Sequence, residues 1–306
     1  MNHNPVKWLA EFRKASALHD HAKLHALRVK IYQQTVKMVL DGGYIDPSGN
    51  KVVFPDRKLV RDSAIFKTKS HYISEDAHFT TNVKVLNEDC LNVANWLWSK
   101  GFKPCVLNMA SRRMPGGGVL TGAGAQEENL FRRTNLFQSL YPFKEELARE
   151  YLVEPREEQY PIERFEGGIY SPTIVVFRGP ESEGYPLLAN PFPVSIATVP
   201  AINRPDLTPD GRLTKELENS YERKMATIFR LAFAGGNDAL VLGAWGCGAF
   251  RNPPADIARL FHKTLDLHEF KNKFAVVVFA ILDDHNTHLA HNPEGNYAPF
   301  AREFGV

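Results

Sequence analysis

The sequence predicts an α/β protein in which helices cover a sheet. Three observations lead to this fold class. From residue 82 onward, short apolar stretches of strand length alternate with stretches of helical periodicity. The last apolar stretch, residues 274–281, is nearly free of polar side chains, as is typical of a strand buried on both faces. Two glycine-containing loops follow predicted strands, where open α/β sheets bind ligands.

The first 80 residues predict a helical extension. Apolar residues recur at helical spacing from Leu24 to Met38, and Asp41-Gly42-Gly43 ends the pattern, so we expect an amphipathic helix over residues 20–40. Residues 44–54 predict a hairpin around Pro47-Ser48-Gly49-Asn50. We therefore expect an N-terminal extension over residues 1–80, packed on a larger domain over residues 81–306.

The larger domain carries the alternating elements. The predicted strands cover residues 83–86, 105–108, 173–177, 194–199, 239–242 and 274–281. Helices are predicted over residues 91–98 and 217–232, and a third helix begins near Pro253. Residues 141–168 are rich in Glu, Arg and Pro, and they predict a surface excursion with some helix.

Composition excludes several classes of protein. Hydrophobic residues make up 43% of the 306 residues and charged residues 24%, as in ordinary soluble domains. The net charge of +2 is too small to indicate a nucleic-acid or membrane surface by itself, although a local basic patch stays open. Three widely spaced cysteines favour reduced thiols. With no signal peptide or apolar span in the sequence, we expect a soluble cytoplasmic protein, or a nuclear one if the source is eukaryotic.

The first loop, residues 115–128, is the most informative stretch of the chain. It holds five glycines within residues 116–124 and leads directly into Gln126, Glu127 and Glu128. Glycine is costly to order, so this density indicates unusual backbone angles or close approach of the backbone to a ligand. We interpret the stretch as an active-site loop; the alternatives are a tight turn and a solvated pair of acids at a helix start.

The second loop is Gly243-Ala244-Trp245-Gly246-Cys247-Gly248-Ala249-Phe250. Backbone N–H groups in such loops bind diphosphates without any lysine. Neither loop matches GxxxxGK[ST] or GxGxxG in context, which disfavours a Walker-type NTPase or a nicotinamide dehydrogenase.

The two acids point to general acid catalysis. Adjacent residues project in different directions, whereas a glycosidase carboxylate pair must flank one bond. We therefore expect one acid and one positioning group. A single glutamate can protonate a departing sugar oxygen while water attacks an oxocarbenium-like centre.

The stretch Gly116-Gly117-Gly118, seven intervening residues and Gln126-Glu127-Glu128 resembles the GGG-x(6-8)-QEE signature of the poly(ADP-ribose) glycohydrolases. Four further segments resemble the microbial type of that family, so the resemblance covers roughly residues 24–285: residues 107–111, residues 170–178 beginning Tyr170-Ser171-Pro172, the second loop, and the Tyr32-Gln33-Gln34-Thr35 helix followed by Gly43-Tyr44. It implies a macrodomain fold, which is a mixed sheet sandwiched between helices, in the catalytic domain.

The resemblance also implies roles for individual residues. Glu128 would protonate the leaving 2′ oxygen of the ribose–ribose bond, Glu127 would bind a ribose hydroxyl, and Gln126 would orient the acids. Gly116, Gly117 and Gly118 would approach the diphosphate and distal ribose, which Asn108 would hold. Gly246, Cys247, Gly248 and Ala249 would wrap the diphosphate, with Phe250 packing on the ligand. Asp89 would accept from the adenine amino group.

We therefore expect a glycosidase that releases ADP-ribose from chain ends and needs no cofactor or metal. Its partner is an ADP-ribose polymer or an ADP-ribosylated macromolecule. Two alternatives stay open: a hydrolase that removes single ADP-ribose units from protein or nucleic acid, and a non-catalytic ADP-ribose-binding module. The sequence does not determine the oligomeric state.

We interpret the remaining histidine clusters and Cys247 as structural residues and not as metal ligands or a nucleophile. His285, His288 and His291 lie beside Asp283 and Asp284, and His19, Asp20, His21 and His25 form a second cluster, but neither has a recognised ligand spacing. Cys247 has no evident histidine partner, so we expect it to be a spacing residue and not a nucleophile. Arg112 and Arg113 either engage further phosphates of a polymer or pair with the Glu-rich segment near Glu157 and Glu158.

Overall fold

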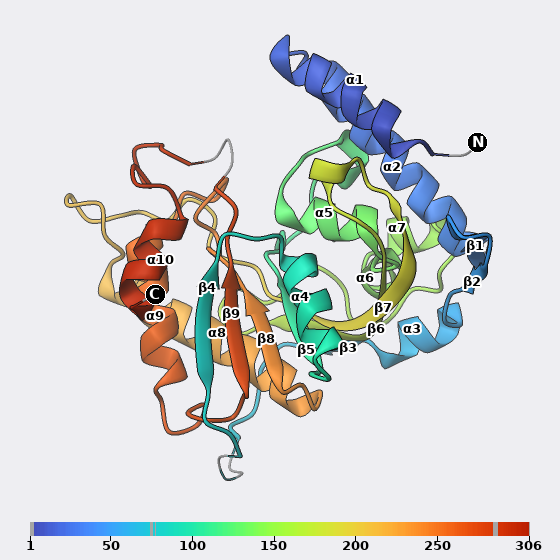
Figure 1. The fold of residues 1–306 in the computed structure, drawn as a ribbon. Coiled ribbons are helices and arrows are strands. Elements are labelled where there is room, and N and C mark those ends of the chain that lie inside the picture. Colours follow the sequence, from blue (N-terminus) through green and yellow to red (C-terminus); the bar gives the residue numbers. More distant parts are fainter. Residues whose placement is uncertain (1–2, 74–75, 77, 284–286, 306) are drawn as a thin grey trace. The chain divides into compact units, whose positions relative to one another are not determined.

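The computed structural model describes residues 3–73, 76, 78–283 and 287–305 (Figure 1). The chain divides into two compact units, each made of three stretches of sequence. Unit 1 consists of Met1–Ala64, Arg113–Tyr160 and Ser171–Val194. Unit 2 consists of Ile65–Arg112, Pro161–Tyr170 and Ser195–Val306. The domain boundary expected near residue 80 stays a prediction.

Unit 1 is mainly helical. The predicted helix over residues 20–40 is confirmed as α2 (His21–Leu40), and the side chain of Asp20 caps it by accepting from the Lys23 N–H. The predicted hairpin is also confirmed, since β1 (Gly43–Ile45) pairs antiparallel with β2 (Lys51–Val53). The other elements of unit 1 are α1 (Pro5–Ala17), α3 (Arg57–Ser63), α5 (Gln126–Arg133), α6 (Phe137–Leu140), α7 (Glu145–Glu150) and the 3-10 turns η1 (Val119–Thr121), η2 (Tyr141–Phe143) and η3 (Glu181–Glu183).

Unit 2 holds most of a mixed seven-stranded sheet with the strand order β3-β6-β7-β5-β8-β9-β4. Strand β3 pairs antiparallel with β6, whereas β7, β5, β8, β9 and β4 are joined by parallel pairs. Strands β6 and β7 begin or end in unit 2 and continue into unit 1. The strands are β3 (Ile65–Lys67), β4 (Asn82–Leu86), β5 (Pro104–Asn108), β6 (Gly168–Arg178), β7 (Leu187–Thr198), β8 (Ala239–Leu242) and β9 (Val276–Ala280), and the helices are α4 (Cys90–Ser99), α8 (Lys215–Ala234), α9 (Pro254–Leu265) and α10 (Tyr297–Phe304).

Both faces of this sheet are buried, as its apolar strands predict. On one face, alternate residues of the central strands, such as Leu107, Leu240 and Val277, pack into a core with α8 and α9. The intervening residues of the same strands face the other side of the sheet and are also buried. The buried side chains of α4 do not belong to the core formed with α8 and α9. Helix α4 contacts β5, β8 and β9. The expected sheet sandwiched between helices is therefore present.

Strands β6 and β7 are longer than predicted. Pro172 lies within β6, and Pro191 and Pro193 lie within β7. Proline cannot donate to a strand ladder, so the sequence pattern predicts a strand only beyond these residues. Among the described residues, no helix is both long and apolar enough to cross a membrane.

Candidate active site

The first glycine loop in unit 1 encloses the two adjacent acids at the start of α5. The Gly116 N–H donates to Glu127 Oε1 at 3.0 Å, and the Gly118 N–H donates to Glu128 Oε1 at 2.8 Å. Both acids lie in the first turn of α5, where the helix dipole favours negative charge. The loop and the acids therefore form one structure, and neither acid has the solvated side chain of the alternative interpretation.

The glycines are required by backbone conformation and by space. Gly116 and Gly117 have φ of +80° and +54°, values that L side chains rarely adopt. A Cβ on Gly116 would lie 2.8 Å from the Phe131 ring, and one on Gly117 would lie 2.5 Å from Glu128 Oε1. A side chain at Gly117 would displace the acid that the backbone holds, and one at Gly116 would displace the Phe131 ring.

Glu128 combines burial with an unused acceptor. The residue is only 6% exposed, and its Oε2 has no hydrogen-bond partner among the described residues. A buried polar atom without a partner is costly, so such an atom indicates an interaction that a ligand completes. The loop holds Oε1 of Glu128, so Oε2 is the oxygen that can interact with a ligand.

Glu127 has aromatic neighbours that the sequence analysis missed. It is 4% exposed, and its charge contributes, after burial itself, to raising the pKa of Tyr160 and of Tyr141. The Tyr141 hydroxyl also contacts the Tyr32 hydroxyl of α2 at 2.7 Å. Nothing in the spacing of these tyrosines along the chain marks them as neighbours of an acid. Gln126 is the first residue of α5.

In unit 2, three predicted site segments follow the parallel strands β4, β5 and β8, so they lie at the same edge of the sheet. Asn108 ends β5 and is fully buried; its Nδ2 donates to Thr198 Oγ1 at 3.2 Å, and its Oδ1 has no partner among the described residues. Gly243, which begins the second loop, lies against Met109, because a Cβ there would be 2.2 Å from the Met109 methyl carbon. Asn108 and the second loop are therefore brought together.

The second loop is held by side chains from outside it. Asn252 donates from Nδ2 to the carbonyls of Gly246 at 3.0 Å and Ile202 at 2.9 Å, and Tyr221 contacts its Oδ1. His291 Nε2 lies 2.7 Å from the carbonyl oxygen of Cys247. The sequence analysis assigned no role to Asn252. The sequence favours a surface or capping role for His291 over a metal site, and in the structure His291 supports the second loop.

Cys247 is buried in the second loop, and burial raises the pKa of its thiol well above the ordinary value. Its Sγ lies 3.7 Å from the Trp245 carbonyl oxygen. A thiol that resists ionisation is a poor nucleophile, which agrees with the expected spacing role. Gly248 and Phe250 are partly exposed, and Ala249 is exposed.

Asp89 is the N-cap of α4, since its Oδ1 accepts from the Leu91 and Asn92 N–H groups at 3.0 Å each. The cap accounts for one carboxylate oxygen and fixes the side chain at the start of the helix. The adenine contact stays a prediction.

Arg112 is paired with the backbone of Ile162. Its Nη1 donates to the Ile162 carbonyl oxygen at 3.2 Å, and the Ile162 N–H donates to the Arg112 carbonyl oxygen at 3.0 Å. In the Glu-rich segment, Glu158 pairs with Arg156 at 3.7 Å. A role for Arg112 and Arg113 in binding further phosphates of a polymer stays a prediction.

The histidine clusters show no metal-ligating arrangement in the part of the chain that the structure describes, where no group of three or more His, Cys, Asp or Glu side chains could hold an ion. Asp20 serves as the cap of α2. His288 Nδ1 lies 3.1 Å from the Pro293 carbonyl oxygen. His285 and Asp284 lie outside the described residues.

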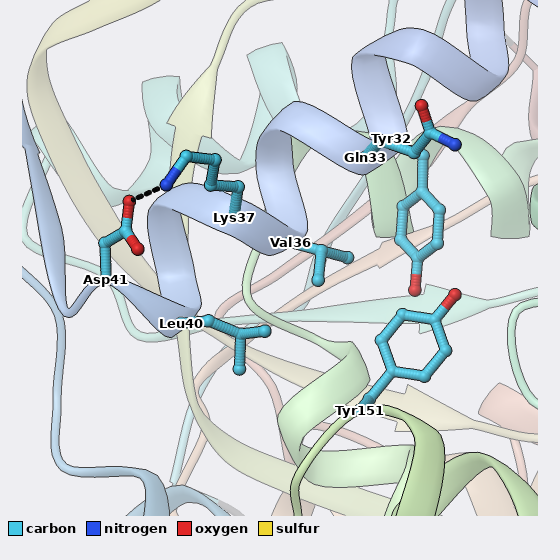
Figure 2. A pocket seen from close by; sticks show the side chains of 7 residues that line it. All are labelled: Tyr32, Gln33, Val36, Lys37, Leu40, Asp41 and Tyr151. Atoms are coloured by element: carbon cyan, nitrogen blue, oxygen red, sulfur yellow. Dashed lines mark hydrogen bonds and ion pairs between the residues drawn. The ribbon is translucent and has the colours of Figure 1, made fainter.

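A separate cavity of about 290 Å³ lies in unit 1 beside the C-terminal half of α2 (Figure 2). Its lining includes none of the predicted site residues: it is formed by Tyr32, Gln33, Val36, Lys37, Leu40, Asp41 and Tyr151. Figure 2 shows Tyr32 and Tyr151 pointing toward one another, and an ion pair joins Lys37 to Asp41 at 2.7 Å. The cavity offers aromatic and aliphatic walls but no acid placed like Glu128.

Comparison with known proteins agrees with this geometry. The family model described as "Microbial-type PARG, catalytic domain" matches residues 32–179. The comparison with curated proteins finds no match. Among solved structures, the chain is similar to the poly(ADP-ribose) glycohydrolase of Thermomonospora curvata, with 31% identity, a TM-score of 0.73, and coverage of 90% of this chain and 99% of that chain.

Two further solved structures carry ligands. The Thermomonospora curvata glycohydrolase bound to the inhibitor ADP-HPD is 30% identical, with a TM-score of 0.70 and coverage of 90% of this chain and 99% of that one. The glycohydrolase of Deinococcus radiodurans in complex with ADP-ribose is 28% identical, with a TM-score of 0.62 and coverage of 83% and 99%. The mixed sheet, the glycine loop that encloses two acids and these similarities lead to one conclusion: the chain belongs to the microbial-type poly(ADP-ribose) glycohydrolase family.

Proposed function

We propose that this protein is a poly(ADP-ribose) glycohydrolase that hydrolyses ribose–ribose O-glycosidic bonds and releases ADP-ribose, with Glu128 as the general acid. One observation carries the proposal: Glu128 is buried, its Oε1 is held by the Gly118 N–H, and its Oε2 has no partner among the described residues. A general acid needs this arrangement, because its proton must reach the leaving oxygen from a defined position.

The reaction divides into two proton transfers around one bond cleavage. Protonated Glu128 gives its proton to the 2′ oxygen as the bond from that oxygen to the anomeric carbon breaks. Positive charge then develops on the anomeric carbon and the ring oxygen, as in an oxocarbenium ion. Water adds to the anomeric carbon and loses a proton to the Glu128 carboxylate, which restores the acid. Glycosidic cleavage of this kind adds one water and leaves two hydroxyl groups.

The neighbouring residues take binding roles in this proposal. Glu127, held by the Gly116 N–H, binds a hydroxyl of the adjacent ribose, and Gln126 helps to orient the pair. The backbone of Gly116–Gly118 approaches the diphosphate and distal ribose without side-chain interference. Asn108 supports this interpretation, since its buried Oδ1 has no partner among the described residues and can accept from a ribose hydroxyl.

The second loop binds the diphosphate through backbone N–H groups, a mode that needs no basic side chain. Its segment Gly246–Ala249 is held by Asn252 and His291, and Phe250 packs against the ligand. Asp89 accepts from the adenine amino group. We also propose the polymer, and not a single modified residue, as the main substrate, and the cytoplasm as the location, which the three free cysteines support.

The test is release of ADP-ribose from purified poly(ADP-ribose) by the parent protein, Glu128→Ala and Glu128→Gln. Loss of the proton donor is expected to lower kcat by about 100-fold or more, because general acid catalysis contributes about 10² to 10⁴ in rate. Binding of ADP-ribose, measured by calorimetry, should persist in Glu128→Gln. The matched control is Glu146→Gln, since the Glu146 side chain is 76% exposed at the start of α7.

The outcomes separate the rival functions. Parent turnover that is lost only in the Glu128 variants supports the glycohydrolase. ADP-ribose binding without release from the polymer would instead favour a binding module or a hydrolase of single ADP-ribose units. A Glu128→Gln variant with the parent's kcat would remove this residue from the acid role.

A further inference from the structure

We propose that Arg28 of α2 is a positioning residue for Glu128, acting through the loop segment between Gly118 and the acid. This segment, residues 119–125, is called the spacer below. The inference rests on the proposed function, because it concerns the acid of that reaction. It gives the N-terminal helices of unit 1 a part in catalysis.

Helix α2 lies directly against the spacer. A Cβ on Gly122 would lie 2.3 Å from the backbone oxygen of His25, so the spacer backbone reaches the backbone of α2 at this point. A Cβ on Gly124 would lie 2.5 Å from the guanidinium carbon of Arg28. Only glycine lets the spacer backbone approach α2 this closely at both positions. At Gly124 the spacer backbone packs against the Arg28 guanidinium.

Arg28 is itself held in one orientation. Its Nε and Nη2 each donate to a different carboxylate oxygen of Glu181 at 2.7 Å. Its guanidinium also lies over the Phe12 ring of α1, 5.1 Å from the ring centre. The two side chains of the ion pair are 13% and 21% exposed. A two-bond arginine–carboxylate pair that is this shielded from water fixes direction as well as charge.

The same carboxylate connects to the helix that carries the acid. The Tyr185 hydroxyl donates to Glu181 Oε2 at 2.8 Å, and Arg132 Nε donates to that hydroxyl at 2.8 Å. Arg132 lies on α5, one turn beyond Glu128, and its Nη1 donates to the Ala123 carbonyl at 2.8 Å. The spacer is therefore held from α2 by Arg28 and from α5 by Arg132. The two arginines are connected through Glu181, which Arg28 bonds, and Tyr185, which Arg132 bonds.

Two backbone contacts carry the position of the spacer to Glu128. The Ala123 N–H donates to the Gly118 carbonyl at 3.1 Å, and the Gly118 N–H donates to Glu128 Oε1 at 2.8 Å. A spacer that moves away from α2 moves the donor that holds the acid. Burial lowers the pKa of Arg28, but its bonds to Glu181 outweigh this effect, and the Glu128 charge adds to the net rise.

The first variant is Arg28→Ala, assayed for ADP-ribose release with kcat and KM measured separately. A displacement of the acid by about 1 Å costs about 100-fold in rate. We expect kcat to fall by about that factor while KM and ADP-ribose binding stay within about 2-fold, because the contacts of Arg28 described above are with the spacer, Glu181 and Phe12. Arg28→Lys keeps the charge and one donor, so it should recover part of the lost kcat.

The second variant, Gly124→Ala, tests the same contact without removing any charge. The added methyl group would displace the Arg28 guanidinium, so we expect the same loss in kcat with KM unchanged. In the Arg28→Ala background the methyl group has room, and Gly124→Ala should then cost little. The combined variant should therefore be no slower than Arg28→Ala alone, which is the signature of two residues acting through one contact.

The matched control is Arg230→Ala in unit 2. Arg230 makes the same kind of two-bond pair with Glu269, at 2.6 and 2.8 Å, and the side chains are 21% and 8% exposed. Loss of this pair is expected to lower the melting temperature, while kcat per folded molecule stays at the parent value. The control separates loss of a shielded ion pair from loss of the spacer contact.

Two results would overturn the positioning role without overturning the proposed function. The first is an active parent together with a folded Arg28→Ala variant whose kcat is unchanged. The second is losses in kcat from Arg28→Ala and Gly124→Ala that are independent and additive. If Arg28→Ala does not fold, Gly124→Ala decides, and its parent-like kcat would reject the proposal. A parent protein that releases no ADP-ribose would overturn the proposed function, and the positioning role with it.

Discussion

Gly117→Ala tests whether the glycine loop is shaped around the acid. The substitution adds a Cβ that would lie 2.5 Å from Glu128 Oε1 and 3.0 Å from Glu127 Oε2. Ordinary contact begins at 3.4 Å, so Glu128 Oε1 or the loop must move by about 0.9 Å. The residue also has φ of +54°, which alanine adopts at a cost of about 1 kcal/mol.

The two effects have different consequences. Backbone strain lowers the free energy of unfolding by about 1 kcal/mol and the melting temperature by about 2 °C in a chain of this size. Displacement of the acid lowers kcat, and a shift of about 1 Å corresponds to about 100-fold. We expect Gly117→Ala to show both losses.

Gly49→Ala is the matched control. Gly49 lies in the turn between β1 and β2 with φ of +87°, and a Cβ there meets nothing within 4 Å. It should carry the same strain without touching an acid, so its kcat should equal that of the parent. The assay is ADP-ribose release by both variants beside thermal denaturation. Equal kcat values for Gly117→Ala and Gly49→Ala would refute the reasoning.

Two further predictions concern unit 2. Lys224 is 1% exposed, and burial lowers its pKa from 10.5 to about 8. Between pH 8 and pH 10.5 the unfolded chain therefore binds more protons than the folded chain, so the free energy of unfolding rises with pH. At pH 7, Lys224→Met should therefore have a free energy of unfolding ~3 kcal/mol above that of the parent. Measured by denaturant unfolding, this difference should shrink from pH 8 to pH 10. A difference that stays constant over this pH range would contradict the prediction. Asp89→Asn keeps an N-cap acceptor, so the melting temperature should hold, while ADP-ribose affinity in calorimetry should fall by about 10-fold if the carboxylate binds adenine; an unchanged Kd would exclude that contact.

Much of the architecture follows from local pattern. The helix over residues 20–40 has regular apolar spacing and a capping aspartate, and it forms as predicted. The strand over residues 274–281 is apolar throughout because both its faces are buried, and β9 (Val276–Ala280) lies within it. Helix α1 was not predicted, although Asn4 caps it and Pro5 begins it. Its few buried residues, Trp8 and Ala15, leave only a weak apolar pattern.

The glycine loop could also be located without a structure. Five glycines before adjacent acids leave few alternatives to close backbone approach, and the structure places Gly116 and Gly118 as donors to Glu127 and Glu128. The spacing of the loop and the acids is a local property of the chain. It therefore indicates the chemistry of the loop before any tertiary contact is known.

The sequence by itself determined the fold class, because each helix and strand has its own local pattern. It also determined the acid pair and the loop that holds it, because these lie together within residues 116–128. Only the tertiary structure decided which groups support them. Arg28 and Glu181 are 153 positions apart, and Cys247 and His291 are 44 apart, yet each pair is in contact. No periodicity links such residues, since their meeting depends on how the helices and strands pack and not on the local order of side chains.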